Sequence, residues 1–146
     1  MSDIPAPLRD RVVLRAGDRC EYCGLSQAGQ EAAFHIDHVV PRVAGGPTEL
    51  DNLALACVSC SLRKWARRSA SDPATGDETP LFSPRAHVWG DHFRWDGAVV
   101  APLTPTGRAT VVALAMNRPL ALAIRLEEAE RGRHPPPSGR EPEIGE

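Results

Sequence analysis

Two C-x-x-C pairs constrain this chain more than any other feature of its sequence. Cys20, Cys23, Cys57 and Cys60 are all of its cysteines, and residues 24–56 lie between the pairs. Two such turns supply four thiolates, which is the ligand set that tetrahedral zinc prefers. All four positions would be filled, so the predicted zinc is structural. Two disulfides, or four buried free thiols, are the alternatives.

Length and composition predict a small domain with a modest core. The chain has 146 residues, with 14 prolines, 12 glycines and few aromatic residues. A bound metal often stabilises a core of this size. The N-terminal residues contain no apolar run, and no segment approaches the ~20 apolar residues that span a bilayer. We therefore expect a cytoplasmic protein that does not enter the membrane, a setting in which paired cysteines bind metal more often than each other.

Charge is distributed unevenly along the chain. The formal net charge is -2, which does not by itself indicate a nucleic-acid partner. A basic segment nevertheless contains Arg63, Lys64, Arg67 and Arg68, with no acidic residue among them. A local cluster of this kind can contact phosphates, so we expect nucleic-acid binding here; an ordinary solvated helix face is the alternative. Trp65, inside this segment, is expected to anchor the core rather than to stack on a base.

Hydrophobic periodicity and turn residues predict an α+β fold. Helices are expected over 5–16, 58–69, 108–117 and 120–132. Strands are expected over 34–40, 53–56, 92–95 and 98–103, the last two joined by an Asp96-Gly97 turn. Residues 70–84 are expected to form a polar loop. The expected organisation is a module over 1–70, a hairpin and two helices over 71–131 packed on it, and a disordered tail over 132–146.

The interval between the cysteine pairs carries a recognisable pattern. It reads His35-Ile36-Asp37-His38-Val39-Val40-Pro41, then Gly45-Gly46, then Asp51-Asn52, and Ser61 and Lys64 follow Cys60. Over residues 17–68 this combination resembles the HNH endonuclease family, in its branch with zinc knuckles.

This resemblance implies a ββα-metal fold, in which a β-hairpin packs on a helix around a catalytic metal. His38 matches the general base of the family, Asp37 the acidic metal ligand, and Asn52 the asparagine that fixes the loop. Lys64 matches a lysine that would contact phosphate. Phosphodiester hydrolysis needs a base that titrates near neutral pH, which suits histidine, and a carboxylate suits Mg²⁺ or Mn²⁺.

Ser61 departs from the family pattern. An Asn or His usually follows the second cysteine pair and completes the catalytic metal site, and a serine hydroxyl is a poorer ligand. His35 and Asp37 share one face of an extended strand, so His35 is a candidate second ligand. A phosphate contact or an ordinary surface histidine is the alternative for His35. Taken alone, Asp37 and His38 could equally be an ion pair at the end of a strand.

The second half of the chain contains His87, Asp91 and His92, but no complete metal-ligand spacing. We expect Trp89, Phe93 and Trp95 to pack the hairpin against the first module instead. A helix that starts near Gly107 could hold a phosphate at its N-terminus, although a cap by Thr106 explains the same residues.

These features predict a metal-dependent endonuclease that acts on DNA, with RNA as the alternative substrate. Because of Ser61, a non-catalytic zinc-knuckle module that binds nucleic acid is the main rival. A structural or protein-interaction domain that uses zinc only for stability is a third hypothesis.

Overall fold

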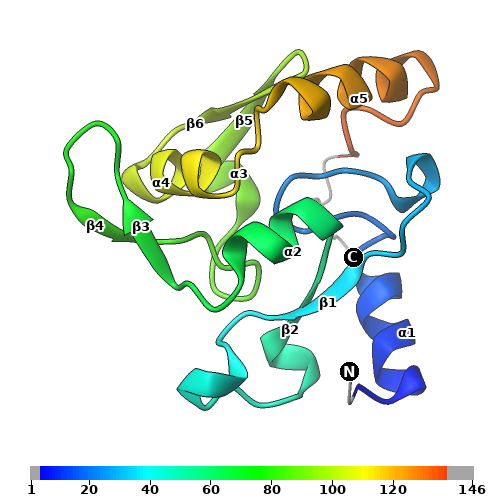
Figure 1. The fold of residues 1–146 in the computed structure, drawn as a ribbon. Helices are drawn as coiled ribbons and strands as arrows, with labels where there is room; N and C mark the ends of the chain where they lie inside the picture. Colours follow the sequence, from blue (N-terminus) through cyan, green and yellow to red (C-terminus); the bar gives the residue numbers. More distant parts are fainter. Residues whose placement is uncertain (1–3, 138–146) are drawn as a thin grey trace.

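The computed structural model describes residues 4–137 and has the α+β architecture that the sequence predicts (Figure 1). Its first half centres on an antiparallel hairpin of β1 (His35–His38) and β2 (Leu53–Ala56). Helix α2 (Val58–Lys64) packs across both strands, and α1 (Ala6–Arg15) packs against β2. Hairpin and α2 together form the expected ββα unit.

Strand β2 is the buried centre of this unit. All four of its residues are buried, because α2 and α1 both pack against it. Its Leu-Ala-Leu-Ala sequence lacks the polar alternation of a half-exposed strand, as a strand covered on both faces should. The register places His38 opposite Leu53 and Asp37 opposite Ala54. Apolar residues of β2 therefore lie beside Asp37 and His38.

Helix α2 ends earlier than the predicted 58–69. The backbone NH of Trp65 donates to the carbonyl of Ser61, and Trp65 then adopts φ 50° and ψ -121°. A positive φ cannot continue a right-handed helix, so the chain turns away at this residue. Trp65 is 63% exposed, which shows that its expected role as a core anchor was wrong.

The second half contains two further hairpins. Strands β3 (Ser69–Ser71) and β4 (Glu78–Pro80) pair within the segment that was expected to be a loop, which corrects that prediction. Asp72 organises their turn by accepting hydrogen bonds from the backbone of Ala74 and from Arg108. A polar sequence can therefore form a short hairpin here because tertiary contacts hold it.

The third hairpin and the last two helices appear near their expected positions, whereas the short helix α3 was not predicted. After α3 (Trp89–His92), the hairpin of β5 (Phe93–Asp96) and β6 (Val99–Pro102) turns at Gly97, whose φ is 62°. Helices α4 (Pro105–Ala113) and α5 (Pro119–Glu130) follow. Thr104, and not Thr106, caps α4: its hydroxyl accepts from the NH of Gly107 at 3.0 Å.

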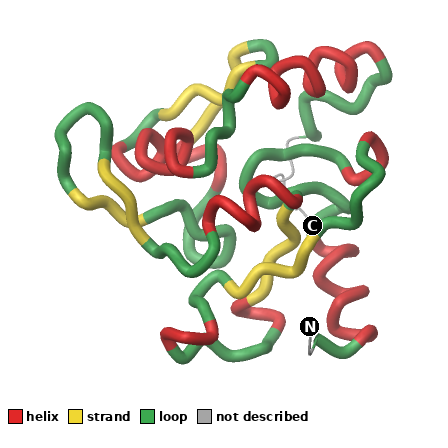
Figure 2. The backbone as a smooth tube through the Cα atoms, in the orientation of Figure 1, coloured by secondary structure: helices red, strands yellow, loops and turns green. Residues whose placement is uncertain are grey.

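Both halves contribute to the main hydrophobic core, a smaller cluster contains Ala70, Leu81 and Ala109, and long loops connect the short elements (Figure 2). The indole NH of Trp89 donates to the carbonyl of Tyr22 at 2.8 Å, and Trp89 stacks on Trp95 with ring centroids 5.1 Å apart. Phe93 is buried in the same cluster. The expected packing of these aromatic residues against the first module is confirmed.

The end of the described chain returns to the first module. Arg133 forms an ion pair with Glu128, and its carbonyl accepts from Arg19. Residues 138–146 of the predicted tail lie outside the described residues. Within residues 4–137, every helix is too short or too polar to cross a lipid bilayer.

Candidate active site and metal centre

Two tight turns bring the four cysteines together. In the first turn, the NH of Gly24 donates to the carbonyl of Cys20, and Gly24 has a φ of 80° that favours glycine. In the second, the NH of Cys60 donates to the sulfur of Cys57 at 3.4 Å, so Cys57 caps α2. The four Sγ atoms are buried and lie within 4.8 Å of one another.

These four sulfurs fit a zinc ion. The Sγ atoms of Cys23 and Cys57 are 3.7 Å apart, close to the ~3.8 Å edge of a tetrahedron with zinc–sulfur bonds of ~2.3 Å. That distance is too long for a disulfide, and all four cysteines are free. The alternative of two disulfides is therefore not what this structure contains.

The protonation preferences of the cluster also call for a cation. Burial raises the pKa of Cys20 well above its usual value, and hydrogen bonding among the cysteines does the same for Cys60. The pKa of Cys57 is lowered, because the other three thiols donate hydrogen bonds to it. A dication would supply the charge that allows buried thiols such as those of Cys20 and Cys60 to ionise.

Next to the cysteines, one face of β1 meets α2. His35 Nδ1 lies 2.9 Å from Ser61 Oγ. Two residues further along β1, the Asp37 carboxylate accepts a 2.6 Å hydrogen bond from the Tyr22 hydroxyl and pairs with Lys64 Nζ at 3.2 Å. His35 and Asp37 therefore share a face of the strand, as the sequence predicts.

Asp37 is nevertheless closed off by internal partners. Burial raises the pKa of Asp37, although the charge of Lys64 and the hydrogen bond from Tyr22 oppose that rise. Lys64 is 2% exposed and also donates to the carbonyls of His38 and Val39. The ammonium group of Lys64 therefore lies against the Asp37 carboxylate, where the family resemblance assigns a divalent metal ion. As they stand, these residues do not fit an open metal site.

His38 closes β1 and lies apart from that buried pair. Its Nε2 atom is 2.9 Å from Thr48 Oγ1 and accepts from Arg42 Nε at 3.3 Å. A nitrogen that accepts a hydrogen bond carries the lone pair, so the hydrogen of a neutral imidazole is on Nδ1. The geometry therefore presents Nε2 as the basic atom of this ring.

Asn52 fixes the loop that carries Arg42 and Thr48. Its Oδ1 accepts from the NH of Val40, and its Nδ2 donates to the carbonyls of Val40 and Pro47. Gly46 packs against this arrangement so closely that a Cβ atom there would lie only 2.8 Å from Asn52 Nδ2. These bonds connect the end of β1 to the far side of the loop.

A comparison with protein families agrees with this geometry. The family model described as HNH endonuclease matches residues 20–67. Those residues form an HNH endonuclease domain. The match begins at the first cysteine and ends just beyond α2, so it includes the ββα unit and the four-cysteine cluster that is typical of the zinc-knuckle branch. No curated protein and no solved structure matches the chain.

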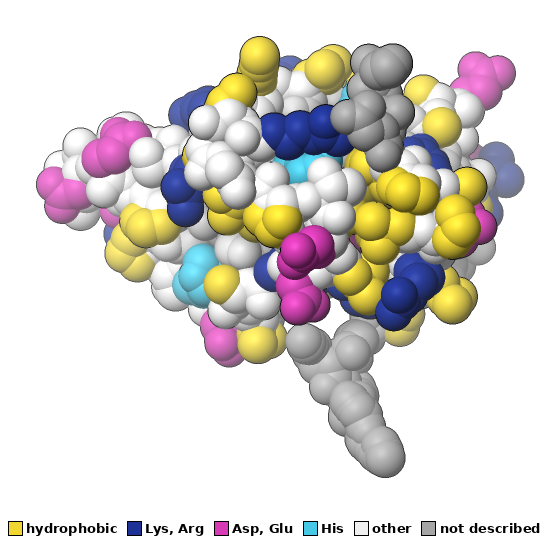
Figure 3. Space-filling view, turned by 90° about the horizontal axis from the view of Figure 1, so that it is seen from below, with side chains coloured by type: hydrophobic (Ala, Val, Ile, Leu, Met, Phe, Trp, Pro, Cys, Tyr) yellow, Lys and Arg dark blue, Asp and Glu magenta, His cyan; other side chains and the backbone are white. Residues whose placement is uncertain are grey.

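The basic residues after the HNH motif divide into two groups. Arg63, Arg67 and Arg68 are exposed, whereas Lys64 points inward to Asp37. On the face shown in Figure 3, basic and acidic side chains are interspersed, in keeping with the small net charge. Any phosphate contact therefore depends on local groups such as the three arginines.

Sequence reasoning missed three residues around the HNH site. Tyr22 lies inside the first C-x-x-C pair and supports Asp37, while Arg42 and Thr48 contact His38 across the loop. A tyrosine between two knuckle cysteines was a usable signal, because a buried hydroxyl needs a polar partner. No local signal identifies Arg42 and Thr48, because their contacts with His38 depend on the path of the loop between β1 and β2.

The histidines of the second half form a separate cluster. The rings of His87 and His92 lie 4.9 Å apart, and His87 Nδ1 accepts from the NH of Ser83. Within residues 4–137, the four cysteines are the only group of three or more candidate ligands close enough to hold a metal.

Proposed function

We propose that this HNH domain hydrolyses phosphodiester bonds in DNA, with His38 as the general base and with RNA as the alternative substrate. The observation that carries the proposal is the environment of His38 Nε2, which accepts from Arg42 beside the hydroxyl of Thr48. A general base needs an oriented nitrogen with a lone pair and a pKa in the physiological range, which imidazole provides.

Each neighbour of His38 has a role in this mechanism. Once Arg42 Nε moves from Nε2 to the phosphate, the lone pair of His38 Nε2 would take the proton from the attacking water, with Thr48 beside the ring. Arg42 would offer its guanidinium to the negative charge that develops on the phosphate, since a fixed cation there stabilises the transition state. Asn52 is a positioning residue: it holds both ends of the loop through its three hydrogen bonds.

Two metals enter the proposal differently. We infer that zinc binds Cys20, Cys23, Cys57 and Cys60 and stabilises the fold, because their sulfurs lie at tetrahedral spacing. A requirement for Mg²⁺ or Mn²⁺ at Asp37, Ser61 and His35 stays a prediction from the family. Lys64 holds Asp37, and Ser61 is bonded to His35, so none of the steps described above depends on that ion.

A second candidate function is nucleic-acid binding without cleavage. The Lys64–Asp37 ion pair and the Ser61–His35 contact favour this function, because they occupy the side chains that would otherwise bind a catalytic metal. Arg63, Arg67 and Arg68 would still contact phosphates. A purely structural role for the zinc module predicts neither cleavage nor binding.

A nicking assay combined with a binding assay separates these three functions. Supercoiled plasmid is incubated with the zinc-loaded protein, with and without Mg²⁺ or Mn²⁺, and binding to labelled DNA is measured over a salt series. Cleavage supports the nuclease. Salt-sensitive binding without cleavage supports the binding module, because phosphate contacts weaken steeply with salt. The absence of both supports the structural role.

A further inference from the structure

Trp65 combines two unfavourable features, a strained backbone and an exposed indole. Its φ of 50° and ψ of -121° favour glycine and cost a larger residue about 1–3 kcal/mol. Its side chain is 63% exposed, and Leu62, one helical turn earlier, is 67% exposed. Strain of this kind concentrates at binding and catalytic sites, where a function compensates for it.

The surroundings of Trp65 match one class of ligand. Arg63, Arg67 and Arg68 are exposed on either side of it in the chain. Among the described residues, none of these three arginines forms an ion pair with a carboxylate. An exposed indole bordered by free positive charge is complementary to a polyanion that carries aromatic rings. Helix α2 also carries Ser61 and Lys64, so this surface borders the HNH site.

We propose that Trp65 and these three arginines form a binding site for unpaired nucleobases. Trp65 stacks on a base while the arginines contact the adjoining phosphates. The proposal rests on the proposed function and narrows its substrate to single-stranded or locally opened nucleic acid. In a duplex the bases are already stacked on one another, so stacking on the Trp65 indole contributes much less to binding there.

A Trp65→Gly variant tests this site sharply, because its effects on folding and on binding should have opposite signs. Glycine relieves the backbone strain, so thermal stability should hold or rise. In a His38→Ala background, which prevents cleavage, affinity for a labelled single-stranded oligonucleotide should fall about 5- to 100-fold. Affinity for the duplex of the same sequence should change much less. Trp65→Phe should retain most of the single-strand affinity, and Leu126→Ala, at an equally exposed position on α5, should retain all of it.

Two results would overturn the stacking site in different ways. If the parent protein binds single strands and Trp65→Gly binds them equally well, the site is wrong and the proposed function stands. If the His38→Ala parent binds neither strand form and the wild-type protein cuts no plasmid, the proposed function fails together with the stacking site.

A separate observation concerns Arg125 of α5, a buried cation without a carboxylate partner. It is 3% exposed and donates to the carbonyls of Ala98 and Met116. Among residues 4–137 no ion pair includes it. A buried charge is costly unless an opposite charge compensates for it.

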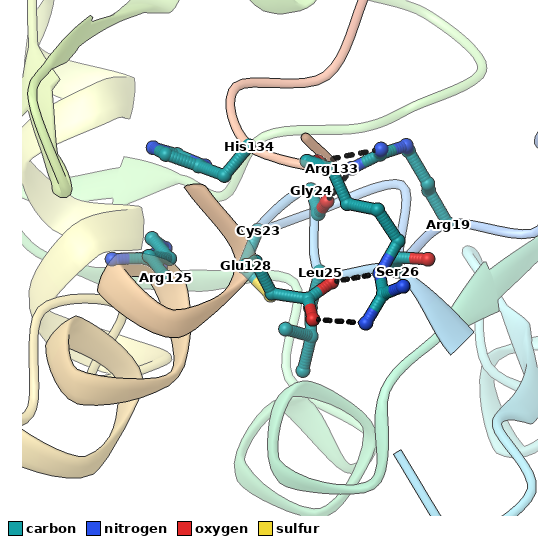
Figure 4. Close-up of a pocket in the computed structure, with 9 residues that line it drawn as sticks. All are labelled: Arg19, Cys23, Gly24, Leu25, Ser26, Arg125, Glu128, Arg133 and His134. Atoms are coloured by element: carbon teal, nitrogen blue, oxygen red, sulfur yellow. Dashed lines mark hydrogen bonds and ion pairs between the residues drawn. The ribbon is translucent and has the colours of Figure 1, made fainter. Parts of the chain in front are cut away.

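The zinc knuckle offers that compensation. Arg125 and Cys23 line one small cavity between α5 and the first knuckle (Figure 4). A zinc ion with four thiolates carries a net charge of about -2.

We infer that Arg125 is the counter-charge of the zinc–thiolate centre and couples α5 to the HNH domain. A cation beside a bound thiolate withdraws electron density from sulfur and makes it less nucleophilic. In zinc-loaded, folded protein, Arg125→Met should therefore speed alkylation of Cys23 by about 10-fold, as followed by mass spectrometry.

Arg125→Lys separates charge from structure. It keeps the positive charge but cannot bridge both carbonyls as the guanidinium does, so it should protect Cys23 nearly as well as wild type. Arg131→Met, which removes an exposed cation from the end of the same helix, should leave alkylation unchanged. If folded, zinc-loaded Arg125→Met reacts at the wild-type rate, or if Arg125→Lys reacts as fast as Arg125→Met, Arg125 serves only to hold the backbone.

Discussion

Lys64 Nζ lies 3.2 Å from a carboxylate oxygen of Asp37, and both side chains are almost completely buried. The pair connects α2 to β1 at the point where the family resemblance assigns a catalytic metal. An ion pair in a dry interior contributes little net stability, yet it is costly to break, because one charge is then left alone.

Lys64→Met should therefore lower the free energy of unfolding by about 3–5 kcal/mol. The double variant Lys64→Met/Asp37→Asn removes both charges and should recover most of that loss. Urea denaturation of the zinc-loaded proteins measures both values. A single variant as stable as wild type would show that the pair does not hold α2 on β1.

The loop between β1 and β2 offers a second prediction. A Cβ atom on Gly46 would lie 1.8 Å from the carbonyl oxygen of Val40, whereas one on Gly45 would meet nothing within 4 Å. Gly46→Ala should therefore displace the loop and lower the cleavage rate more than Gly45→Ala does. An alanine at position 45 meets no neighbouring atom and is strained only by its backbone φ of 89°.

Nicking rates and thermal stabilities of the two glycine variants provide the check. Gly45→Ala should lose about 1 kcal/mol through backbone strain and keep most of its activity. Equal activities of the two variants would argue that the loop does not position Arg42 and Thr48 for His38.

Zinc removal is the basis of a third prediction. Cys57→Ser keeps a side-chain oxygen that can cap α2, since serine is a favourable N-cap residue. It nevertheless removes one of the four thiolates. We expect loss of bound zinc and a large decrease in helical signal, because metal binding energy here is folding energy. Metal analysis and circular dichroism test this, and a well-folded, zinc-free variant would contradict it.

Asp72 gives a prediction for the dependence of stability on pH. Hydrogen bonds from Arg108 lower the pKa of Asp72 to about 2 in the folded protein, against about 3.9 in an unfolded chain. The ionised Asp72 therefore stabilises the folded protein above about pH 4. This stabilisation is lost as the pH falls through about 2, because the unfolded chain binds the proton more tightly than the folded protein does.

The comparison with Asp72→Asn isolates this effect, since loss of zinc in acid affects both proteins equally. The stability advantage of wild type should be constant above pH 4 and should shrink toward pH 2. An advantage that is independent of pH would mean that the Asp72–Arg108 contact acts without its charge.

Local pattern predicted the parts of this fold that depend on local sequence. The apolar run of β2, the β5–β6 hairpin and the paired cysteines each carry their signal within a few residues, although the hairpin turns at Gly97 and Ala98, one residue later than expected. The HNH pattern likewise fixed the positions of His38 and Asn52 along the ββα unit.

The errors arose where distant residues decide the outcome. Strands β3 and β4 are polar and short, and they form because Arg108 of α4 holds Asp72. In the sequence Lys64 is one of four basic residues in a short run, and only the packing of α2 on β1 turns its side chain inward to Asp37. The exposure of Trp65 follows from a single backbone angle that helix propensity does not predict.

Single-turnover nicking of supercoiled plasmid by wild type and His38→Ala tests the central claim most directly, provided that both proteins retain their zinc. Loss of a positioned general base should lower the rate by about two to four orders of magnitude while zinc content, thermal stability and DNA affinity stay unchanged. A His38→Ala protein that cuts at the wild-type rate would contradict the assignment of His38 as the base. A wild-type protein that binds DNA but never cuts it, with any divalent metal, would contradict the nuclease itself.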